Sequence, residues 1–357
     1  MAVGVGVALV CAVLAQLACE SVVPTPEQPV DAPRNATEVL AQGLRIPWAL
    51  AFLPDGDIIM TERPGRVRLF EMEAGLRDEP LLEMPGVAAQ GEGGLLGVAV
   101  HPEYPDPPYI YFYHTYSGGF GLANRVVRYS MSGNLLVDGL VLLDGITGAG
   151  IHDGGRLKFG PDGFLYITTG DASSSERSQD PDSLAGKILC MADDGSVPAG
   201  NPFNGSFVYS MGHRNPQGIA WDADGRLWAT EHGSSATDEV NLIQPGNNYG
   251  WPVIRGDETA AGMESPVLHS GRETWAPSGL AYHDGSLFFA GLRGGGLYEL
   301  TLSSSTLQKH LDGEFGRLRD VVVGPDGSLY LLTSNRDGRA IPGLSDDRLI
   351  RVDVESL

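Results

Sequence analysis

The chain has 357 residues, 42% of them hydrophobic, which is enough to bury the core of one large β domain or of two ordinary domains. Its formal net charge of −21 at pH 7 argues against a general binder of nucleic acids or anionic membranes, because both functions need a basic surface. The 49 glycines are scattered among runs that contain valine, leucine and tyrosine, which favours many short strands joined by turns.

The N-terminal segment has the pattern of a targeting sequence. Residues 2–18 carry no charge, are rich in small residues and precede Cys19. We predict a signal peptide or lipoprotein signal over residues 1–19 and a Pro-rich tether over 20–37, although Gln16 stands where lipoprotein sites prefer leucine. The protein would then be periplasmic or exported, either free or lipid-anchored through Cys19. An uncleaved membrane anchor is the alternative.

A strand–turn–strand unit then recurs six times at a spacing of about 40 to 60 residues. The units are ALAFLPDGDIIMTE (49–62), LLGVAVHPEYPDPPYIYFYHT (95–115), RLKFGPDGFLYITTGD (156–171), GIAWDADGRLWATEHG (218–233), GLAYHDGSLFFAGLRG (279–294) and DVVVGPDGSLYLLTSN (320–335). Their turns are rich in Asp-Gly, which supplies the positive φ that tight hairpins need. Weaker strand candidates lie between the hairpins at 66–72, 124–131 and 295–302.

Six similar hairpins predict an all-β fold, a six-bladed β-propeller with four-stranded antiparallel blades, over residues 38–357. We expect the segment 347–354 to supply a strand that closes the ring on the N-terminal blade. A β-sandwich or a pair of barrels is the alternative, but neither predicts six similar hairpins in succession.

The hairpins place a set of chemically reactive residues at one end. Residues just before the first strand and just after the second lie opposite the turn, and in a propeller these ends gather on one face around the central channel. The residues at these positions are Glu92, His152, Asp171, Arg214, Asn215, Glu231, His232, Trp275, Arg293, Arg317 and Arg319. Because the turn ends hold mostly Pro, Asp and Gly, we predict the functional site on the first face.

Four arginines on this face come from three different repeats of an acidic protein. Guanidinium groups match carboxylates or phosphates bidentately, so the set predicts an anionic ligand. Each arginine taken singly is more commonly a member of a surface or blade-to-blade ion pair.

The segment IHDGGRLKFGPDGFLYITTGD (151–171) carries the candidate catalytic pair. His152 stands before the first strand of a hairpin and Asp171 stands after the second, so the hairpin brings them to the same end. His152 would act as a general base in an open cavity. Asp171 would fix its tautomer and stabilise its protonated form. A structural histidine is the alternative.

The segment EHGSSATDEVNLIQPGNNYGW (231–251) has the oxygen-rich composition of a calcium site, and the turn at Gly233 and Ser234 would offer backbone carbonyls. No histidine–cysteine spacing in the sequence supports a zinc site. The sequence also contains no glycine-rich phosphate loop or dinucleotide fingerprint in a strand–helix setting, and no nucleophile elbow.

These residues resemble the soluble PQQ-dependent sugar dehydrogenases of the glucose/sorbosone dehydrogenase family, especially its bacterial aldose sugar dehydrogenase branch. The resemblance covers roughly residues 38–355, and the specificity lies in the order of its motifs. They are GEGGLLGVAVHP (91–102), HDGGRLKFGPDGFLYITTGD (152–171), LAGKIL (184–189), GHRNPQGIAWD (212–222), DEVNLIQPGNNYGWP (238–252), WAPSGLA (275–281) and GRLRDVVVGPDG (316–327).

The resemblance implies that pyrroloquinoline quinone (PQQ) lies on the predicted face, with His152 as catalytic base and Asp171 as its support. The implied cofactor contacts are Glu92, His152, Arg214, Asn215, Trp275, Arg293, Arg317 and Arg319. The implied metal is Ca²⁺, bound to PQQ and held by the backbone carbonyls of Gly233 and Ser234. A further implied calcium site involves Glu239 and Tyr249.

The implied reaction is oxidation of an aldose at its anomeric carbon to a lactone, with hydride transfer to calcium-bound PQQ and electrons leaving to an external acceptor. PQQ is a tricarboxylate, which agrees with the arginine set. Two positions depart from the family pattern: Glu92 stands where relatives often have glutamine, and Ser234 stands where proline is common. A carboxylate beside an anionic cofactor is unfavourable unless it is protonated, metal-bound or paired with an arginine.

Two other functions stay open: a propeller binding module that has lost the cofactor, and a calcium-dependent sugar lactonase. Retention of His152, Asp171 and the arginine set favours the dehydrogenase over the binding module. A lactonase would need several carboxylates or asparagines converging on the channel, which the channel-facing arginines disfavour.

Overall fold

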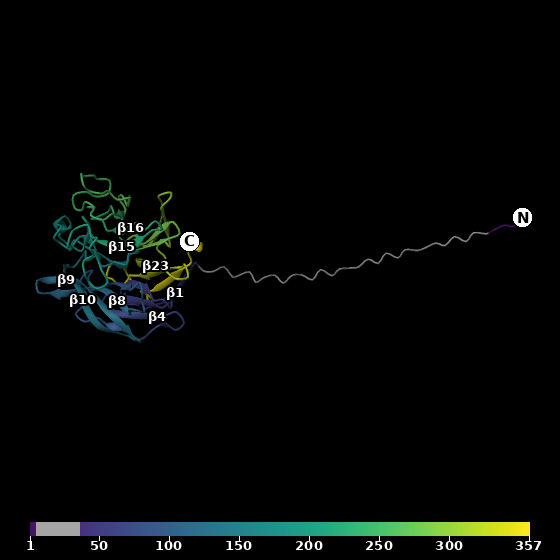
Figure 1. The fold of residues 1–357 in the computed structure, drawn as a ribbon, viewed down its shortest axis with the longest axis horizontal. Helices are drawn as coiled ribbons and strands as arrows, with labels where there is room; N and C mark the ends of the chain where they lie inside the picture. The colour runs from purple at the N-terminus through teal and green to yellow at the C-terminus, as the bar shows by residue number, and fades with distance from the viewer. Residues whose placement is uncertain (5–35) are drawn as a thin grey trace. The chain divides into compact units, whose positions relative to one another are not determined.

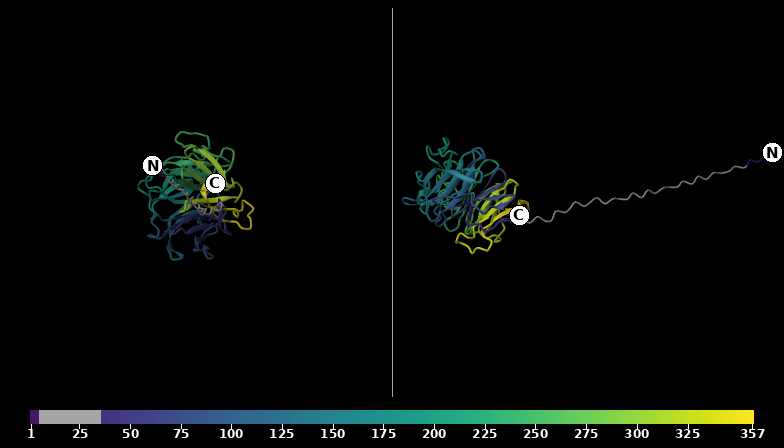
Figure 2. Two further views of the ribbon diagram at one scale, coloured as in Figure 1. Left: turned by 90° about the vertical axis from the view of Figure 1, so that its right-hand side faces the viewer. Right: turned by 90° about the horizontal axis from the view of Figure 1, so that it is seen from below.

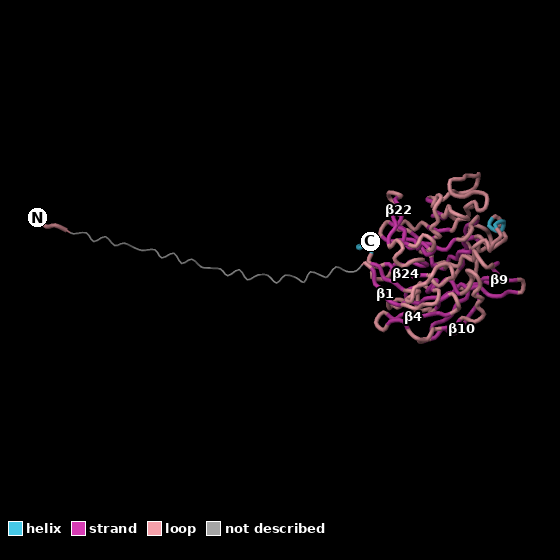
Figure 3. The backbone as a smooth tube through the Cα atoms, turned by 180° about the vertical axis from the view of Figure 1, so that it is seen from behind, coloured by secondary structure: helices cyan, strands magenta, loops and turns pink. Residues whose placement is uncertain are grey.

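The computed structural model describes residues 1–4 and 36–357, and nearly all of their regular structure is β-strand (Figure 1). Two short 3-10 turns, η1 (Ser175–Ser178) and η2 (Val354–Ser356), are the only helical elements of these residues (Figure 3). Neither is long or apolar enough to cross a membrane. Residues 5–19 of the predicted signal segment and residues 20–35 of the predicted tether lie outside the described residues.

Six antiparallel sheets follow one another along the chain, and each is built on one of the six predicted hairpins. The first three sheets contain β2 (Pro47–Phe52), β3 (Ile58–Glu62), β4 (Arg66–Glu71), β5 (Gly75–Leu76) and β6 (Leu82–Glu83); β7 (Leu95–Val100), β8 (Tyr109–Gly118), β9 (Gly121–Ser132) and β10 (Leu135–Thr147); and β11 (Leu157–Phe159), β12 (Leu165–Thr169), β13 (Lys187–Met191) and β14 (Val208–Met211). The last three contain β15 (Pro216–Trp221), β16 (Leu227–Glu231), β17 (Glu239–Ile243) and β18 (Leu268–His269); β19 (Pro277–His283), β20 (Ser286–Gly291), β21 (Gly296–Thr301) and β22 (Thr306–His310); and β23 (Leu318–Val323), β24 (Leu329–Thr333), β25 (Leu349–Val352) and β1 (Thr37–Ala41).

These sheets are the blades of a six-bladed β-propeller, so the predicted fold is confirmed. The first strands of neighbouring blades contact each other at the centre, as in β2 with β7, β15 with β19 and β23 with β2. In the left view of Figure 2 the colour passes around the ring from purple through teal and green to yellow, so the blades follow chain order. The outer edge of the first blade is split between β5 and β6, which both pair with β4.

The ring closes differently from our expectation. The C-terminal strand β25 does not join the N-terminal blade but pairs with β24 in the last blade. Instead the N-terminal strand β1 crosses to the last blade and pairs with β25, with Thr37 opposite Val352. The physical reason is that β25 is only the third strand of its blade, and β1 covers its outer edge, which would otherwise expose unpaired backbone groups.

The hairpin turns form as the sequence predicts. In the β11–β12 turn Gly163 adopts a φ of 80°, a conformation that side chains rarely allow. The preceding Asp162 accepts a hydrogen bond from the backbone N–H of Phe164 at 3.2 Å, which fixes the return of the chain. The turn therefore holds two strands of opposite direction in register, and with them the residues at the far end of the hairpin.

The second strand of each blade lies at the interior of its sheet, and β3, β12, β16 and β24 are buried along their whole length. Aromatic side chains pack the blades against each other. Tyr166 of the third blade meets Trp221 of the fourth edge to face at 5.0 Å, and Phe52 of the first meets Tyr330 of the last at 4.9 Å. The hairpin ends that carry the site therefore project from a close-packed scaffold.

Candidate active site

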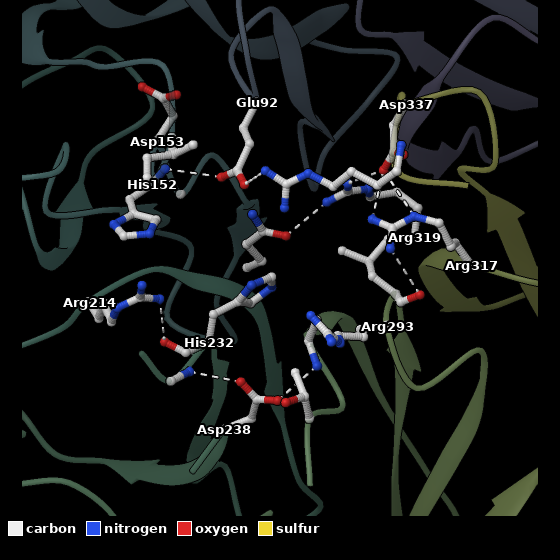
Figure 4. A pocket seen from close by; sticks show the side chains of 18 of the residues that line it. Glu92, His152, Asp153, Arg214, His232, Asp238, Arg293, Arg317, Arg319 and Asp337 are labelled. Atoms are coloured by element: carbon white, nitrogen blue, oxygen red, sulfur yellow. Dashed lines mark hydrogen bonds and ion pairs between the residues drawn. The ribbon is translucent and has the colours of Figure 1, made fainter. Parts of the chain in front are cut away.

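The hairpin ends opposite the turns enclose a cavity of about 470 Å³, a size typical of small-ligand sites (Figure 4). Of the residues to which the sequence analysis gave a catalytic, cofactor or metal role, eight line it: Glu92, His152, Arg214, Gly233, Ser234, Arg293, Arg317 and Arg319. His232, which the hairpin pattern placed on the same face, lines it too. These residues lie in or beside the second to sixth blades, at the ends of the first and second strands. The structure thus brings together most of the predicted site.

Five other predicted site residues do not line the cavity: Asp171, Asn215, Glu239, Tyr249 and Trp275. Asp171 and Asn215 are buried behind the segment that carries the candidate base. Asp171 contacts the ring of His152, and Asn215 accepts a hydrogen bond from the backbone N–H of Gly154. Trp275 is buried against Phe289 and Tyr298, and only its neighbours in the chain reach the cavity.

The pair His152–Asp171 has the geometry of an oriented base. The Nδ1 atom of His152 lies 2.8 Å from a carboxylate oxygen of Asp171, which also accepts a hydrogen bond from the backbone of Ser173 at 2.9 Å. The other carboxylate oxygen accepts from the indole N–H of Trp251 at 2.9 Å. Because a carboxylate accepts hydrogen bonds, it holds the proton on Nδ1 and leaves Nε2 as the basic nitrogen.

The backbone around His152 is fitted closely to the neighbouring strand. His152 itself has a φ of 63°, which is uncommon for a residue with a side chain. A Cβ atom at Gly170 would overlap the carbonyl oxygen of His152, so only glycine allows Asp171 to approach the histidine this closely. Gly170 is therefore required for the close approach of Asp171 to His152.

Arginine dominates the electrostatics of the cavity. Its lining includes the arginines Arg63, Arg214, Arg293, Arg317, Arg319 and Arg339, and the acidic residues Glu92, Asp153, Asp238 and Asp337. Counting six positive and four negative groups leaves a formal excess of two positive charges, although the whole chain carries −21. Burial lowers the pKa of Arg319 to about 9, with Asp337 acting in the opposite direction. An anionic ligand would relieve this excess.

Several buried donors at the cavity have no hydrogen-bond partner among the described residues. They are Nε of Arg214, Nε of Arg319 and Nδ2 of Asn215, and the ring nitrogen Nε2 of His232 is likewise buried without a partner in the same part of the chain. Burial lowers the pKa of His232 to about 4, so its ring is neutral at pH 7. Buried polar atoms are normally paired, and such a concentration of unpaired donors is what a site for a polar, anionic group requires.

A carboxylate at the position of Glu92 is expected to need protonation, a metal or an arginine partner, and the structure supplies the arginine. One oxygen of Glu92 accepts a hydrogen bond from the backbone N–H of His152 at 3.0 Å, and the other pairs with Arg339 at 2.6 Å. Burial alone would raise the pKa of Glu92, but the backbone hydrogen bond from His152 and the charge of Arg339 hold it below its usual value. Glu92 is therefore ionised, paired with an arginine and tied to the candidate base.

Asp238 organises the predicted calcium turn. One oxygen accepts the backbone N–H of Gly233 at 2.8 Å, and the other accepts the N–H groups of Trp275 and Ala276 at 2.6 and 2.8 Å. The carbonyl oxygens of Gly233 and Ser234 accept no hydrogen bond from the described residues. No group of three or more His, Cys, Asp or Glu side chains in residues 1–4 and 36–357 could hold a metal, so a cation here would depend on such carbonyls.

The second predicted calcium position lies apart from the cavity. The carboxylate of Glu239 accepts hydrogen bonds from the backbone N–H of Gly256 and from the side-chain amide nitrogen of Asn241. The side-chain oxygen of Asn241 is buried and has no partner in the described part of the chain. Burial, followed by the charge of Glu231, raises the pKa of Glu239 to about 7. The Tyr249 hydroxyl is engaged with the backbone of Gln244 and Leu242, so its side chain is already satisfied.

Sequence reasoning missed several polar residues of the cavity, among them Arg63, Gln217, Asp238, Asp337 and Arg339. Asp337 accepts two hydrogen bonds from Arg317, at 3.1 and 2.8 Å, and so orients a predicted ligand-binding arginine. Asp238 and Asp337 lie in loops beyond the hairpins, where no repeat pattern indicates them. A count of charged residues in the loops that follow each second strand would have identified both.

Asp153 gives a prediction about pH. Burial raises the pKa of its carboxyl to about 6, and one of its oxygens has no hydrogen-bond partner among the described residues. The folded protein then holds this proton more tightly than the unfolded chain, so rising pH costs stability between about pH 4 and 6. Asp153→Asn cannot ionise and retains an oxygen for Asn124 and Ala149.

Urea unfolding at pH 5 and pH 7.5 measures this effect. From pH 5 to 7.5 the stability of Asp153→Asn relative to wild type is expected to increase by about 1.4 kcal/mol. Asp78→Asn, at an exposed position, provides the control and should show no such change. A constant difference between Asp153→Asn and wild type at the two pH values would contradict the raised pKa.

The fold and the site together define a class of protein: a six-bladed propeller whose arginine-lined cavity contains a histidine oriented by an aspartate. The model of the Glucose / Sorbosone dehydrogenase family matches residues 44–346, and the chain belongs to that family. The resemblance drawn from the motifs is thereby confirmed.

Individual relatives agree with this assignment. Aldose sugar dehydrogenase YliI of Escherichia coli is 34% identical over 343 residues, which cover 85% of this chain and 91% of that protein. Quinoprotein glucose dehydrogenase B of Acinetobacter calcoaceticus is 34% identical over 258 residues, covering 63% of this chain and 54% of that protein. The solved structure of the PQQ-bound aldose sugar dehydrogenase of Streptomyces coelicolor superposes with a TM-score of 0.83 at 43% identity, covering 89% of this chain and 97% of that one.

Proposed function

We propose that this protein is a PQQ-dependent dehydrogenase that oxidises aldose sugars at the anomeric carbon to lactones. The observation that carries the proposal is the His152–Asp171 pair facing a cavity with an excess of arginine. Membership of the glucose/sorbosone dehydrogenase family and the PQQ-bound relative support the same reaction class.

The residues of the cavity fit PQQ in charge and in hydrogen bonding. PQQ is a tricarboxylate, and the cavity offers an excess of positive charge together with unpaired buried donors on Arg214, Arg319 and Asn215. Arg293 and Arg317 line the same cavity and would complete the set. When bound, PQQ supplies the electron-accepting group for the hydride that leaves the sugar carbon.

His152 would take the proton from the anomeric hydroxyl through Nε2, the ring nitrogen that Asp171 leaves without a proton. The buried Asp171 carboxylate then stabilises the imidazolium that forms. The Glu92 carboxylate holds the backbone of His152 in place during this step. Both sugar and electron acceptor would reach the site from outside the protein.

Calcium would bind at the carbonyl oxygens of Gly233 and Ser234, which are free of hydrogen bonds from the described residues and belong to segments lining the cavity. A second ion at Glu239 would satisfy the buried oxygen of Asn241 and involve the backbone of Tyr249. We further propose that the N-terminal segment directs export to the periplasm, with Cys19 as the residue that would carry a lipid.

Reconstitution tests the proposal. Purified apoprotein is incubated with PQQ and Ca²⁺, and the aldose-dependent reduction of an artificial dye is followed over a broad sugar panel. We expect saturable PQQ binding and turnover with at least one aldose. Absence of both would exclude the dehydrogenase and favour a binding module. Release of product from a lactone without PQQ would favour the lactonase.

The Glu92–Arg339 pair gives a prediction for cofactor affinity. Arg339→Met removes the ion-pair partner of Glu92 and leaves a carboxylate facing an anionic ligand. The dissociation constant for PQQ, measured by calorimetry, is expected to rise about tenfold, equivalent to about 1.4 kcal/mol. The double variant Glu92→Gln/Arg339→Met should recover most of the affinity. An unchanged dissociation constant in Arg339→Met would mean that the pair does not control the charge at the cavity.

A further inference from the structure

A second cavity, of about 460 Å³, lies in the central channel toward the turn ends of the first strands. First strands from all six blades contribute to it: β2, β7, β11, β15, β19 and β23. The arginine-lined cavity occupies the opposite ends of the same hairpins. The channel cavity is therefore distinct from the arginine-lined cavity that the proposed function uses.

The walls of this channel cavity are mainly apolar. Phe52, Val98, Val100, Phe159, Val322 and Val323 line it. An apolar cavity of this size suits the body of a small organic molecule, because each buried hydrocarbon group gains free energy on leaving water.

The channel cavity contains three charged residues: Arg156, Lys158 and Asp320. Arg156 and Asp320 pair with each other at 2.9 Å, and the Asp320 oxygen in that pair also accepts the backbone N–H of Leu50. The backbone of Lys158 pairs with that of Tyr166 in the β11–β12 ladder, but its ammonium group makes no hydrogen bond or ion pair with any residue of 1–4 or 36–357. One positive charge therefore stays without a partner in an apolar setting.

The lowered pKa of Lys158 also indicates that its positive charge lacks compensation. Burial lowers its pKa to about 8, and the opposing attraction of Asp320 is smaller. Lys158 is half-buried, and an ammonium group without a partner beside apolar walls favours the binding of a compensating anion. Charge and shape together thus define the chemistry of an occupant.

We propose that the channel cavity binds a small organic anion with an apolar body and a single carboxylate or sulfonate head, and that Lys158 is its ion-pair partner. The apolar walls take the body of the ligand, and the ammonium group takes the head. A nucleotide or a sugar phosphate does not fit this chemistry, because the remaining charges, Arg156 and Asp320, already neutralise each other.

The channel cavity is separated from the arginine-lined cavity by a packed layer. The Arg156 side chain donates to the carbonyl of Gln217 at 2.9 Å, and the Gln217 side chain accepts from Arg319 at 2.8 Å. The guanidinium group of Arg156 also stacks on the ring of Trp48, with its central carbon 4.4 Å from the ring centroid. Binding in the two cavities is therefore expected to be independent, and variants can distinguish them.

Calorimetric titration of the full chain with octanoate, at pH 7 and without PQQ, tests the proposal. We expect binding of one octanoate that Lys158→Met weakens by about tenfold or more and that Lys158→Arg retains. Arg293→Met, in the arginine-lined cavity, is the matched control and should leave this binding within about twofold of wild type. Thermal unfolding of each variant verifies that it folds.

The pH dependence adds a second readout. Octanoate affinity of wild type should fall between pH 7 and pH 9 as Lys158 loses its charge, while the affinity of Lys158→Arg should stay constant, because arginine remains protonated. Arg156 and Asp320, the other charged groups of the cavity, are unchanged in both proteins. Binding that Lys158→Met leaves intact, binding lost in Arg293→Met, or no binding of octanoate would each overturn the proposal.

Discussion

His152→Ala is expected to lower kcat for aldose oxidation by about 10²–10⁴-fold while leaving PQQ bound. The variant removes the nitrogen that would accept the hydroxyl proton, but it keeps the arginines that line the cavity. Its backbone contact with Glu92 is made by the main chain and is also retained. Steady-state dye reduction measures kcat, and calorimetry measures the dissociation constant for PQQ.

The matched control for this variant is His283→Ala. His283 ends the first strand β19 at the turn, away from the cavity, and its loss should leave kcat unchanged. Asp171→Asn is expected to reduce kcat in the same direction as His152→Ala, because an amide cannot hold the Nδ1 proton as a carboxylate does. Retained activity in His152→Ala would assign the base to another residue.

The sequence predicted this pair because both residues are tied to a hairpin of known geometry. His152 and Asp171 flank a Pro-Asp-Gly turn, and strands β11 and β12 pair in register from Leu157 to Phe159. A hairpin converts sequence distance into spatial proximity, so residues outside its strands meet at the open end. The same reasoning located the arginines and the six blades.

The remainder depends on loops for which no repeat sets the geometry. Arg339 reaches Glu92 across 247 positions of sequence, and its loop contains no strand between β24 and β25. Glu92 could be recognised as an unfavourable charge, but its partner could not be named. The burial of Trp275 beside Phe289 and Tyr298 likewise depends on packing within its blade, which a motif does not specify.

Ring closure shows the same limit. Both terminal segments have strand character, and either could complete a blade. The choice depends on which blade lacks a strand, and the blade of β23, β24 and β25 lacks one until β1 is added. Local sequence cannot count the strands of a distant sheet, so only the assembled ring decides between the two ends of the chain.

Asp238→Ala is expected to destabilise the protein by about 3–5 kcal/mol and to abolish calcium-dependent PQQ binding. Its carboxylate accepts the backbone N–H groups of Gly233, Trp275 and Ala276 and is buried. Removing it leaves three donors without their acceptor, and hydrogen bonds to charged groups are among the stronger ones. Urea unfolding measures the free energy, and calorimetry with PQQ measures the dependence on Ca²⁺.

The two readouts separate the local role of Asp238 from a general loss of stability. Asp224→Ala, which removes a mostly exposed carboxylate from the ion pair with Arg226, is the control and should cost no more than about 0.5 kcal/mol. Asp238→Asn keeps one oxygen acceptor and should fold with an intermediate stability. If that folded variant bound PQQ and Ca²⁺ as wild type does, the turn at Gly233 would not need the carboxylate. If Asp238→Asn remained folded but its PQQ binding no longer depended on Ca²⁺, the role of Asp238 would be to position the turn at Gly233 for the ion.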